Sequence, residues 1–307
     1  MTVLVGIVCS DGVVIGCDSA ELAGRSGQYT IERQEGVFKT EIIGNDVITA
    51  YTGATGLAQR INERITSTLE MLKAPFAGPV VMTGIGLRAD PIQQFLIDRF
   101  KKGQVPYGAL KAVEVAVILA QAVINDFHRT LSAQQQQPAV GWGLGALLGF
   151  IKDNEPELIE FDPVQFHPQL KGQPDSERGD KDRNWRAVSM GAGKQLADAF
   201  LAHSYRLLFG DRVPTIERAK LVIAWTIDHV RRYNAGWVGG PTHLVVLRMV
   251  DGKGHAQHES VDETHQQMVA LEEYITAFRV QQNTADKGAL DLNKALDLPK
   301  DQPEKKP

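Results

Sequence analysis

Residues 2–20 read TVLVGIVCSDGVVIGCDSA, two apolar runs rich in β-branched residues on either side of an Asp-Gly pair. An Asp-Gly pair between such runs is a strong signal for a β-hairpin. The segment therefore predicts strands at residues 2–9 and 13–20, joined through Ser10-Asp11-Gly12. The chain begins with the first hairpin of a β-sheet.

The length of the hairpin loop determines which side chains share a face of the sheet, because side chains alternate with a period of two. A two-residue loop would place Val5 opposite Asp18, and Asp18 would then point away from the face that carries Thr2. A three-residue loop, with Gly12 in a left-handed conformation, would place Leu4 opposite Asp18. Asp18 and Thr2 would then share one face, and we favour this register.

Thr2 directly follows Met1, and its side chain is small enough for an aminopeptidase to remove the methionine. The processed chain would begin with a threonine that carries both a hydroxyl group and a free α-amine. An N-terminal threonine with its own amine as the base is an established kind of activated nucleophile. The amine titrates near pH ~7.7–8.0, close to the range that suits a general base. Small residues are common at position 2, so this interpretation depends on the residues that follow.

The composition is that of a globular chain of 307 residues, of which 43% are hydrophobic. This is enough for one large domain or two small ones. The formal net charge of −4 gives no electrostatic footprint for nucleic acid. The cysteines, Cys9 and Cys17, have no His or further Cys near them at a zinc-like spacing. We therefore expect two buried strand residues rather than a disulfide framework or a metal site.

The sequence contains no targeting or cofactor motif. Its apolar start has no positively charged region, and Asp11 and Gly12 interrupt it, so a signal peptide is not expected. No stretch approaches the ~20 apolar residues of a membrane-spanning helix. A phosphate-binding glycine loop is absent, and we expect His255 and His258 to lie solvated in a polar loop. The sequence thus predicts a soluble, cytoplasmic protein with no cofactor, metal, nucleic-acid partner or membrane partner.

The order of the remaining elements predicts the fold class. Further strands are expected at residues 36–43, 47–51, 145–151, 157–162, 187–190 and 243–250. Helices are expected at residues 57–72, 91–102, 107–133, 193–209, 215–233 and 263–278. This order fits two antiparallel sheets with helices on the outside, an α+β layered fold. Residues 1–279 are expected to form a single domain, followed by a polar, disordered tail at residues 280–307.

The helix expected at residues 107–133 is long and apolar. Its candidates for burial include Val113, Val117, Ala120 and Ile124. Its alanines also suit close packing against another helix. Two interpretations remain open, because the helix can belong to the internal core or can supply a packing surface for a second subunit.

Four groups of residues together resemble the β-subunits of proteasomes. They are Thr2, Asp18-Ser19-Ala20, Lys39 at the start of the second hairpin, and Ala50-Tyr51-Thr52-Gly53 before a helix. The resemblance covers roughly residues 2–250 and extends to bacterial homologues such as HslV and Anbu. The carboxy-terminal length and the insertion around residues 75–100 favour a bacterial homologue, in particular a betaproteobacterial one.

The resemblance implies a fold and a mechanism. The fold would be a four-layer αββα sandwich of two antiparallel sheets flanked by helices, that of the N-terminal-nucleophile (Ntn) hydrolases. Thr2 Oγ would attack the scissile amide, with Lys39 beside it as an ammonium or a base and Asp18 orienting Lys39. The N–H group of Gly53 would stabilise the oxyanion. Taken one at a time, these residues have purely structural explanations. Asp18 could be a turn or cap residue, Lys39 a solvated charge at the edge of a sheet, and Gly53 a turn glycine.

Two regions depart from the family pattern. Ala192 stands where the family usually has a serine between two glycines. Asn234 aligns with the family's aspartate near the last helix–strand junction, and Trp237 aligns with the serine that follows it. Asn234 can form hydrogen bonds but carries no negative charge. The accessory groups that orient the threonine amine are therefore altered, which fits a slow enzyme.

The resemblance leaves three functions open. The leading one is a threonine-type endopeptidase within a self-compartmentalising, homo-oligomeric ring. It would act on peptides or unfolded proteins, with an ATP-dependent unfoldase as a candidate partner. The second is a catalytically impaired ring subunit that serves as a scaffold or binding protein, which the residues at positions 192 and 234 favour. The third is a small-molecule amidase of the same fold.

Overall fold

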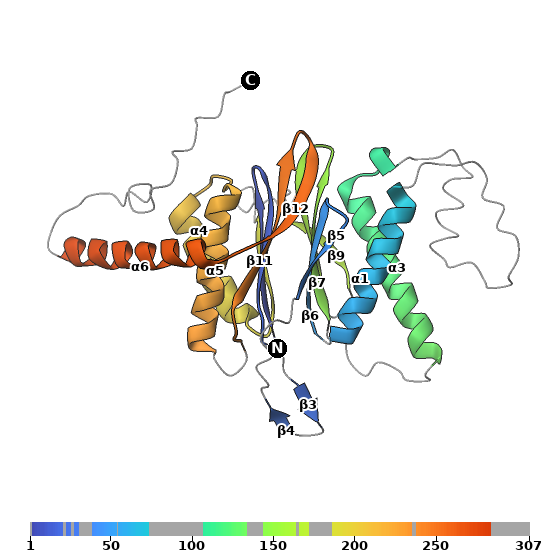
Figure 1. Cartoon of the computed structure of the whole chain (residues 1–307), viewed down its shortest axis with the longest axis horizontal. Coiled ribbons are helices and arrows are strands. Elements are labelled where there is room, and N and C mark those ends of the chain that lie inside the picture. Colours follow the sequence, from blue (N-terminus) through green and yellow to red (C-terminus); the bar gives the residue numbers. More distant parts are fainter. Residues whose placement is uncertain are drawn as a thin grey trace, which may run out of the picture.

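The computed structural model describes residues 2–20, 23–25, 28–30, 39–53, 55–73, 107–133, 144–163, 166–171, 186–234 and 238–283. These residues form an α+β structure with two antiparallel sheets between layers of helices (Figure 1). The fold class predicted from the order of the elements is confirmed at this level. The helix expected at residues 91–102, Trp237 and residues 284–307 lie outside the described residues.

The first sheet has the amino-terminal hairpin at its centre. Its strands are β1 (Val3–Cys9), β2 (Gly12–Asp18), β10 (Ala187–Gly191), β11 (Thr242–Val250) and β12 (Lys253–Glu259). They follow the order β10-β1-β2-β11-β12, and every pairing is antiparallel. Along β1, Val3 and Val5 face the helices, whereas Leu4 and Val8 face the second sheet. Apart from Asp18, the strands of the hairpin are apolar because both of their faces are buried.

The second sheet lies against the first and has the order β5-β6-β7-β8-β9. Its strands are β5 (Thr40–Ile43), β6 (Val47–Thr52), β7 (Gly145–Lys152), β8 (Glu155–Phe161) and β9 (Pro168–Lys171). β5 and β6 form the predicted second hairpin, whereas β9 was not expected from the sequence. A separate pair of short strands, β3 (Ala23–Arg25) and β4 (Gln28–Thr30), completes the β structure of the described residues.

Helices cover the outer face of each sheet (Figure 1). The short 3₁₀ helix η1 (Tyr107–Ala109) precedes α3 (Ala112–Ala133), which packs with α1 (Thr55–Lys73) on the second sheet. α4 (Lys194–Phe209) and α5 (Ile216–Tyr233) pack on the first sheet, and α6 (Asp262–Asn283) packs against α5. α6 continues past residue 279, where the polar tail was expected to begin.

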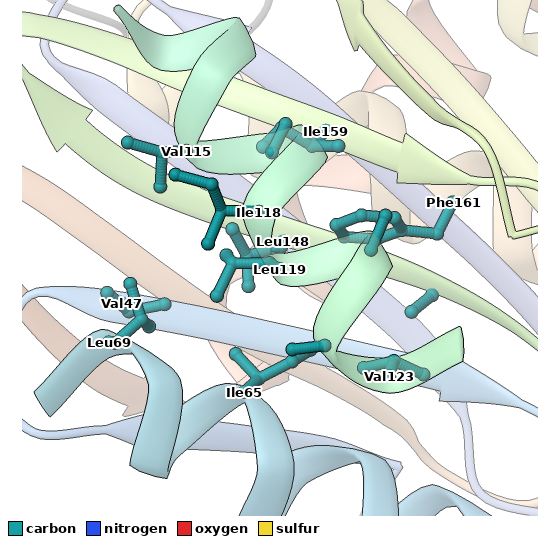
Figure 2. Close-up of a cluster of buried hydrophobic side chains, with 14 of the residues drawn as sticks. Val47, Ile65, Leu69, Val115, Ile118, Leu119, Val123, Leu148, Ile159 and Phe161 are labelled. Atoms are coloured by element: carbon teal, nitrogen blue, oxygen red, sulfur yellow. The ribbon is translucent and has the colours of Figure 1, made fainter. Parts of the chain in front are cut away.

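Buried side chains join the layers in three clusters, one between the sheets and one beneath each set of helices. Figure 2 shows the cluster on the second sheet, where Leu119 of α3 lies among Ile65 and Leu69 of α1 and Leu148 of β7. The helix predicted at residues 57–72 is confirmed, and its apolar side chains face the cluster: Ile61, Ile65, Leu69 and Leu72 are buried, and Leu57 is partly buried. Each sheet therefore packs on both faces.

The prediction for α3 is wrong for two of its four candidates for burial. Val113 and Val117 are 47% and 51% exposed, whereas Ala120 is buried as expected and Ile124 is partly buried against the cluster on the second sheet. The buried face runs through Val115 and Leu119, which are fully buried in the cluster on the second sheet (Figure 2). Successive residues turn by about 100° around a helix, and α3 carries apolar residues on several faces. Periodicity therefore could not select the face that meets the sheet.

The favoured three-residue loop of the first hairpin is also wrong, and neither expected register is present. The turn contains Ser10 and Asp11 alone, and Gly12 belongs to β2. Asp11 is held in the turn because its Oδ1 accepts a hydrogen bond of 2.9 Å from the Ile216 N–H at the start of α5. The turn of the hairpin is therefore bound to a helix that begins more than 200 residues later in the chain.

The loop expected around His255 and His258 is instead strand β12, at the edge of the first sheet. Both histidines are exposed, as predicted. An edge strand tolerates polar residues because one side of it faces solvent. The polar composition of this segment therefore led to the prediction of a loop where the structure has a strand.

Candidate active site

Thr2 lies at the amino end of β1, in the interior of the first sheet, and is 4% exposed. Val3 pairs with Gly191 on β10. Gly191 has a φ of 91°, and a Cβ atom on this residue would lie 2.0 Å from the carbonyl oxygen of Thr2. Only a glycine allows the end of β10 to approach the Thr2 backbone so closely.

The register of the first hairpin brings Asp18 to Val3 rather than to Leu4. Leu4 pairs with Cys17, and continuing this register by one residue sets Asp18 opposite Val3. The Oδ1 atom of Asp18 accepts a hydrogen bond of 2.9 Å from the Val3 N–H. Asp18 therefore binds the backbone next to Thr2, the candidate nucleophile. The expected arrangement, in which Asp18 and Thr2 share a face of the sheet, is not present.

The carboxylate of Asp18 is fully buried and accepts four hydrogen bonds. Oδ1 accepts from the Val3 N–H at 2.9 Å and from the Lys39 ammonium at 3.0 Å. Oδ2 accepts from the N–H groups of Ala20 at 3.3 Å and Gly239 at 3.2 Å. Burying a carboxylate is costly unless it is paired and hydrogen-bonded, and these donors satisfy both conditions. They also hold the carboxylate in one orientation.

Lys39 comes from the second sheet and reaches across to the first. Its backbone, just before β5, accepts a hydrogen bond of 3.0 Å from the Tyr51 N–H of β6. Its Nζ donates to Asp18 Oδ1 at 3.0 Å and to the Ala20 carbonyl oxygen at 2.7 Å. A group that donates to both a carboxylate and a carbonyl is typical of an ammonium. The structure therefore brings together the Lys39–Asp18 pair predicted from the sequence.

Gly53 lies in an exposed turn after β6 and has a φ of 124°, a conformation that favours glycine. The Oγ1 atom of the preceding Thr52 is 3.3 Å from the position that a Cβ atom on Gly191 would take. Gly191 also contacts the Thr2 backbone. The Gly53 turn is therefore at the same end of the two sheets as Thr2.

The two accessory positions lie just after β10 and at the end of α5. Ala192 occupies an exposed turn between β10 and α4, directly after Gly191, whose backbone approaches that of Thr2. Asn234 ends α5, where its N–H donates to the Val230 carbonyl oxygen at 2.8 Å. Its carbonyl oxygen accepts from the Val238 N–H at 3.1 Å. Ala192 thus carries no hydroxyl group in the turn after Gly191, and Asn234 contributes backbone hydrogen bonds.

Sequence reasoning missed Gly239, whose two backbone groups bind the end of β2. Its N–H donates to Asp18, and its carbonyl oxygen accepts from the Ser19 N–H at 3.2 Å. The signal in the sequence is the Gly239-Gly240 pair just before β11. A glycine pair indicates a turn or a close approach, but it does not say which residue the turn contacts.

His243 was also missed, although it lies close to the charged pair. It pairs with Cys17 across β11 and β2 and is half-buried. Burial lowers the pKa of His243, and its electrostatic interactions with His258 and Lys39 lower the pKa further, whereas Asp18 acts in the opposite direction. The neutral imidazole is thus favoured, and His243 lies within electrostatic reach of Lys39 and Asp18.

The two cysteines are buried strand residues, as predicted. Cys9 and Cys17 are both 0% exposed. Burial raises the pKa of the Cys17 thiol to about 12, although Lys39 opposes the increase. Cys17 therefore remains a neutral thiol beside the charged pair.

No helix in the described residues is long and apolar enough to cross a membrane. Comparison of the chain with protein-family models and with curated proteins gave no match. The function is therefore inferred from the residues around Thr2.

Proposed function

We propose that the protein is a threonine-type endopeptidase with an Ntn-hydrolase fold, in which Thr2 becomes the nucleophile once Met1 is removed. The observation that carries this proposal is the shared oxygen of Asp18. Asp18 Oδ1 accepts hydrogen bonds from the Val3 N–H, next to Thr2, and from the Lys39 ammonium. The layered arrangement of two antiparallel sheets and outer helices also supports it.

In the first step, Thr2 Oγ forms a bond to the carbonyl carbon of the scissile amide. The hydroxyl gives its proton to the α-amine of Thr2, which passes it to the nitrogen of the leaving amine as the C–N bond breaks. The hydrogen bonds of Lys39 to Asp18 and Ala20 suit an ammonium. In that state Lys39 lowers the cost of deprotonating the hydroxyl by its charge, rather than taking the proton itself.

The remaining steps use backbone groups and the freed α-amine. The Gly53 N–H, in the turn that leads into α1, stabilises the negative charge that develops on the carbonyl oxygen. Water then attacks the ester formed on Thr2 and gives a proton to the α-amine. Cleavage of the ester returns the proton to Thr2 Oγ.

A catalytically impaired subunit is the second candidate function. It is favoured by Ala192, which has no hydroxyl group to hold the threonine amine beside Thr2. Asn234, which cannot carry charge, favours it as well. In this case the fold would serve as a scaffold or binding protein.

We also propose that the chain assembles into a homo-oligomeric ring through its outer helices. Val113 and Val117 on α3 are 47% and 51% exposed, which is unusual for two valines one turn apart. Such residues suit a surface that becomes buried against a second copy. Peptides or unfolded proteins would be the substrates, with an ATP-dependent unfoldase as a candidate partner.

The test of the activity is the intact mass of the purified protein before and after incubation with an α′,β′-epoxyketone. This reagent needs a hydroxyl group and a free amine on the same residue. We expect loss of Met1 and one adduct for the wild type and for Thr2→Ser, and no adduct for Thr2→Ala. A processed chain that forms no adduct would overturn the peptidase proposal and favour the impaired subunit.

A further inference from the structure

A short segment that leads into β11, residues 238–242, lies against the end of β2. Gly239 donates its N–H to Asp18 Oδ2 at 3.2 Å, and its carbonyl oxygen accepts from the Ser19 N–H at 3.2 Å. Thr242, the first residue of β11, pairs directly with Asp18. We refer to residues 238–242 as the Gly239 segment. Its position determines what the second oxygen of Asp18 binds.

The Gly239 segment approaches Ser19 closely. Gly240 has a φ of 70°, and a Cβ atom on it would lie 2.3 Å from Ser19 Oγ. Ser19 is fully buried, and its hydroxyl group has no hydrogen-bond partner among the described residues. The Ser19 hydroxyl therefore does not hold the Gly239 segment, and its anchors must lie elsewhere.

Helix α5 anchors the Gly239 segment at both ends. At one end, the Val238 N–H donates to the Asn234 carbonyl oxygen at 3.1 Å, and the Val238 side chain is buried. At the other end, Arg231 Nη2 donates to Thr242 Oγ1 at 2.7 Å. Arg231 is thus the side chain of α5 that ties the helix to the start of β11.

The contacts of Arg231 show that Thr242 is its main polar partner. Its Nη1 is 3.7 Å from Asp228 Oδ1, whereas the Nε of the neighbouring Arg232 is 2.6 Å from Asp228 Oδ2. The Nε of Arg231 is buried without a hydrogen-bond partner in the described part of the chain. Arg231 and Thr242 line a cavity of about 490 Å³ that extends to His265 of α6. The Arg231 side chain therefore lies along the wall of this cavity and reaches β11 at Thr242.

We propose that Arg231 is a positioning residue for the Thr2 site. It holds Thr242, and with it the Gly239 N–H, against Asp18. Asp18 in turn orients Lys39, so Arg231 acts without touching the reacting atoms. The effect of Arg231 on the reaction rests on the proposed function of Thr2, whereas its effect on the Gly239 segment does not.

The test compares Arg231→Met with Arg232→Met, a matched change one residue later whose partners are Asp228 and Glu272. Two quantities are measured for each variant: hydrogen exchange at the Gly239 amide and the rate of epoxyketone labelling. A hydrogen bond from a charged donor is strong enough for its loss to slow labelling by about tenfold. We expect this slowing, together with faster exchange, in Arg231→Met but not in Arg232→Met.

Two further variants separate positioning from a general loss of stability. Thr242→Val removes the acceptor of the same hydrogen bond, so Arg231→Met combined with Thr242→Val should be no slower than either variant alone. Arg231→Lys keeps a cationic donor and should restore most of the labelling rate. If Arg231→Met does not fold, Thr242→Val carries the test.

The outcomes distinguish this proposal from the proposed activity. Faster exchange at Gly239 in Arg231→Met supports the positioning role, even if no variant and no wild-type protein is labelled. In that case the peptidase proposal fails alone. Unchanged exchange at Gly239 in both Arg231→Met and Thr242→Val overturns the positioning role, as does equal slowing of labelling in Arg232→Met.

Discussion

The Lys39 ammonium and the Asp18 carboxylate form an ion pair of 3.0 Å that joins the two sheets, and their side chains are 10% and 0% exposed. A pair this deeply buried depends on both partners, because either charge alone would be left without compensation. The same carboxylate oxygen binds the backbone beside Thr2. A change at the pair should therefore affect both stability and the candidate nucleophile.

Replacing Lys39 with methionine should destabilise the protein strongly. Removal of one partner from a buried ion pair typically costs about 3–5 kcal/mol, because the Asp18 charge remains buried. Urea unfolding measures the change in the free energy of unfolding. The double variant Asp18→Asn, Lys39→Met should recover part of the loss, and a double variant less stable than Lys39→Met would contradict this account.

Replacing Gly191 with alanine should distort the strand that contacts Thr2. Gly210 provides a matched control, because it also has a positive φ, of 59°, but has no atoms within 4 Å of an added Cβ. Gly210→Ala should cost about 1–2 kcal/mol from backbone strain alone. Gly191→Ala should cost more, because its Cβ would lie 2.0 Å from the Thr2 carbonyl oxygen. Equal destabilisation of the two variants in urea unfolding would show that Thr2 is not tightly held by β10.

Stability at acidic pH should depend on Glu259 of β12. Burial by itself would raise the pKa of this carboxyl group, but hydrogen bonds from Lys220, Arg248 and Gln257 hold it at about 2. The folded-state pKa is thus below the unfolded value of about 4.3. The stabilisation is fully present above that value and is lost as the pH falls toward 2.

We therefore expect the wild-type protein to lose stability as the pH falls from about 4.3 toward 2, and Glu259→Gln to show a shallower loss. Urea unfolding at several pH values measures this dependence. Glu70→Gln, on the exposed side of α1, should retain the wild-type profile. A Glu259→Gln profile parallel to the wild type would show that the ion-pair network does not act in solution.

Replacing Val117 with aspartate tests the proposed ring. The side chain is 51% exposed, so the fold should tolerate the change, whereas a subunit interface on α3 should not. Sedimentation velocity should show an assembly for the wild type and smaller species for Val117→Asp. Val250→Asp is the control, because Val250 is 46% exposed at the end of β11. A monomeric wild-type protein, or an intact Val117→Asp assembly, would argue against this surface.

Local sequence patterns predicted most elements because their physical causes are local. The stripe from Ile61 to Leu72 fits a helix that buries one face, and the Asp-Gly pair fits a hairpin. The predicted Lys39–Asp18 pair came from the resemblance to proteasome subunits, and the structure brings these residues together. Their catalytic role, and that of Thr2, stays a prediction.

The predictions were wrong where several local conformations were compatible with the sequence and contacts with distant residues accompany the one that forms. The sequence allowed two loop lengths around Asp11, but the hairpin has a third register, in which Asp11 binds the Ile216 N–H of a distant helix. α3 could turn several apolar faces toward the sheet, and packing against α1 left Val113 and Val117 outside. Neither the register of the hairpin nor the orientation of α3 could be predicted from the local sequence pattern.

The sequence by itself determined that two apolar hairpins and several amphipathic helices would form a layered α+β protein, because periodicity and turn residues act over short distances. Tertiary structure alone decided what surrounds Thr2. Asp18 binds Val3 and Gly239, which are 15 and 221 residues away along the chain. The hairpin sets Asp18 opposite Val3, whereas the contact with Gly239 forms only once β11 has joined β2 in the first sheet, because nothing in the local sequence holds residues 221 positions apart next to one another.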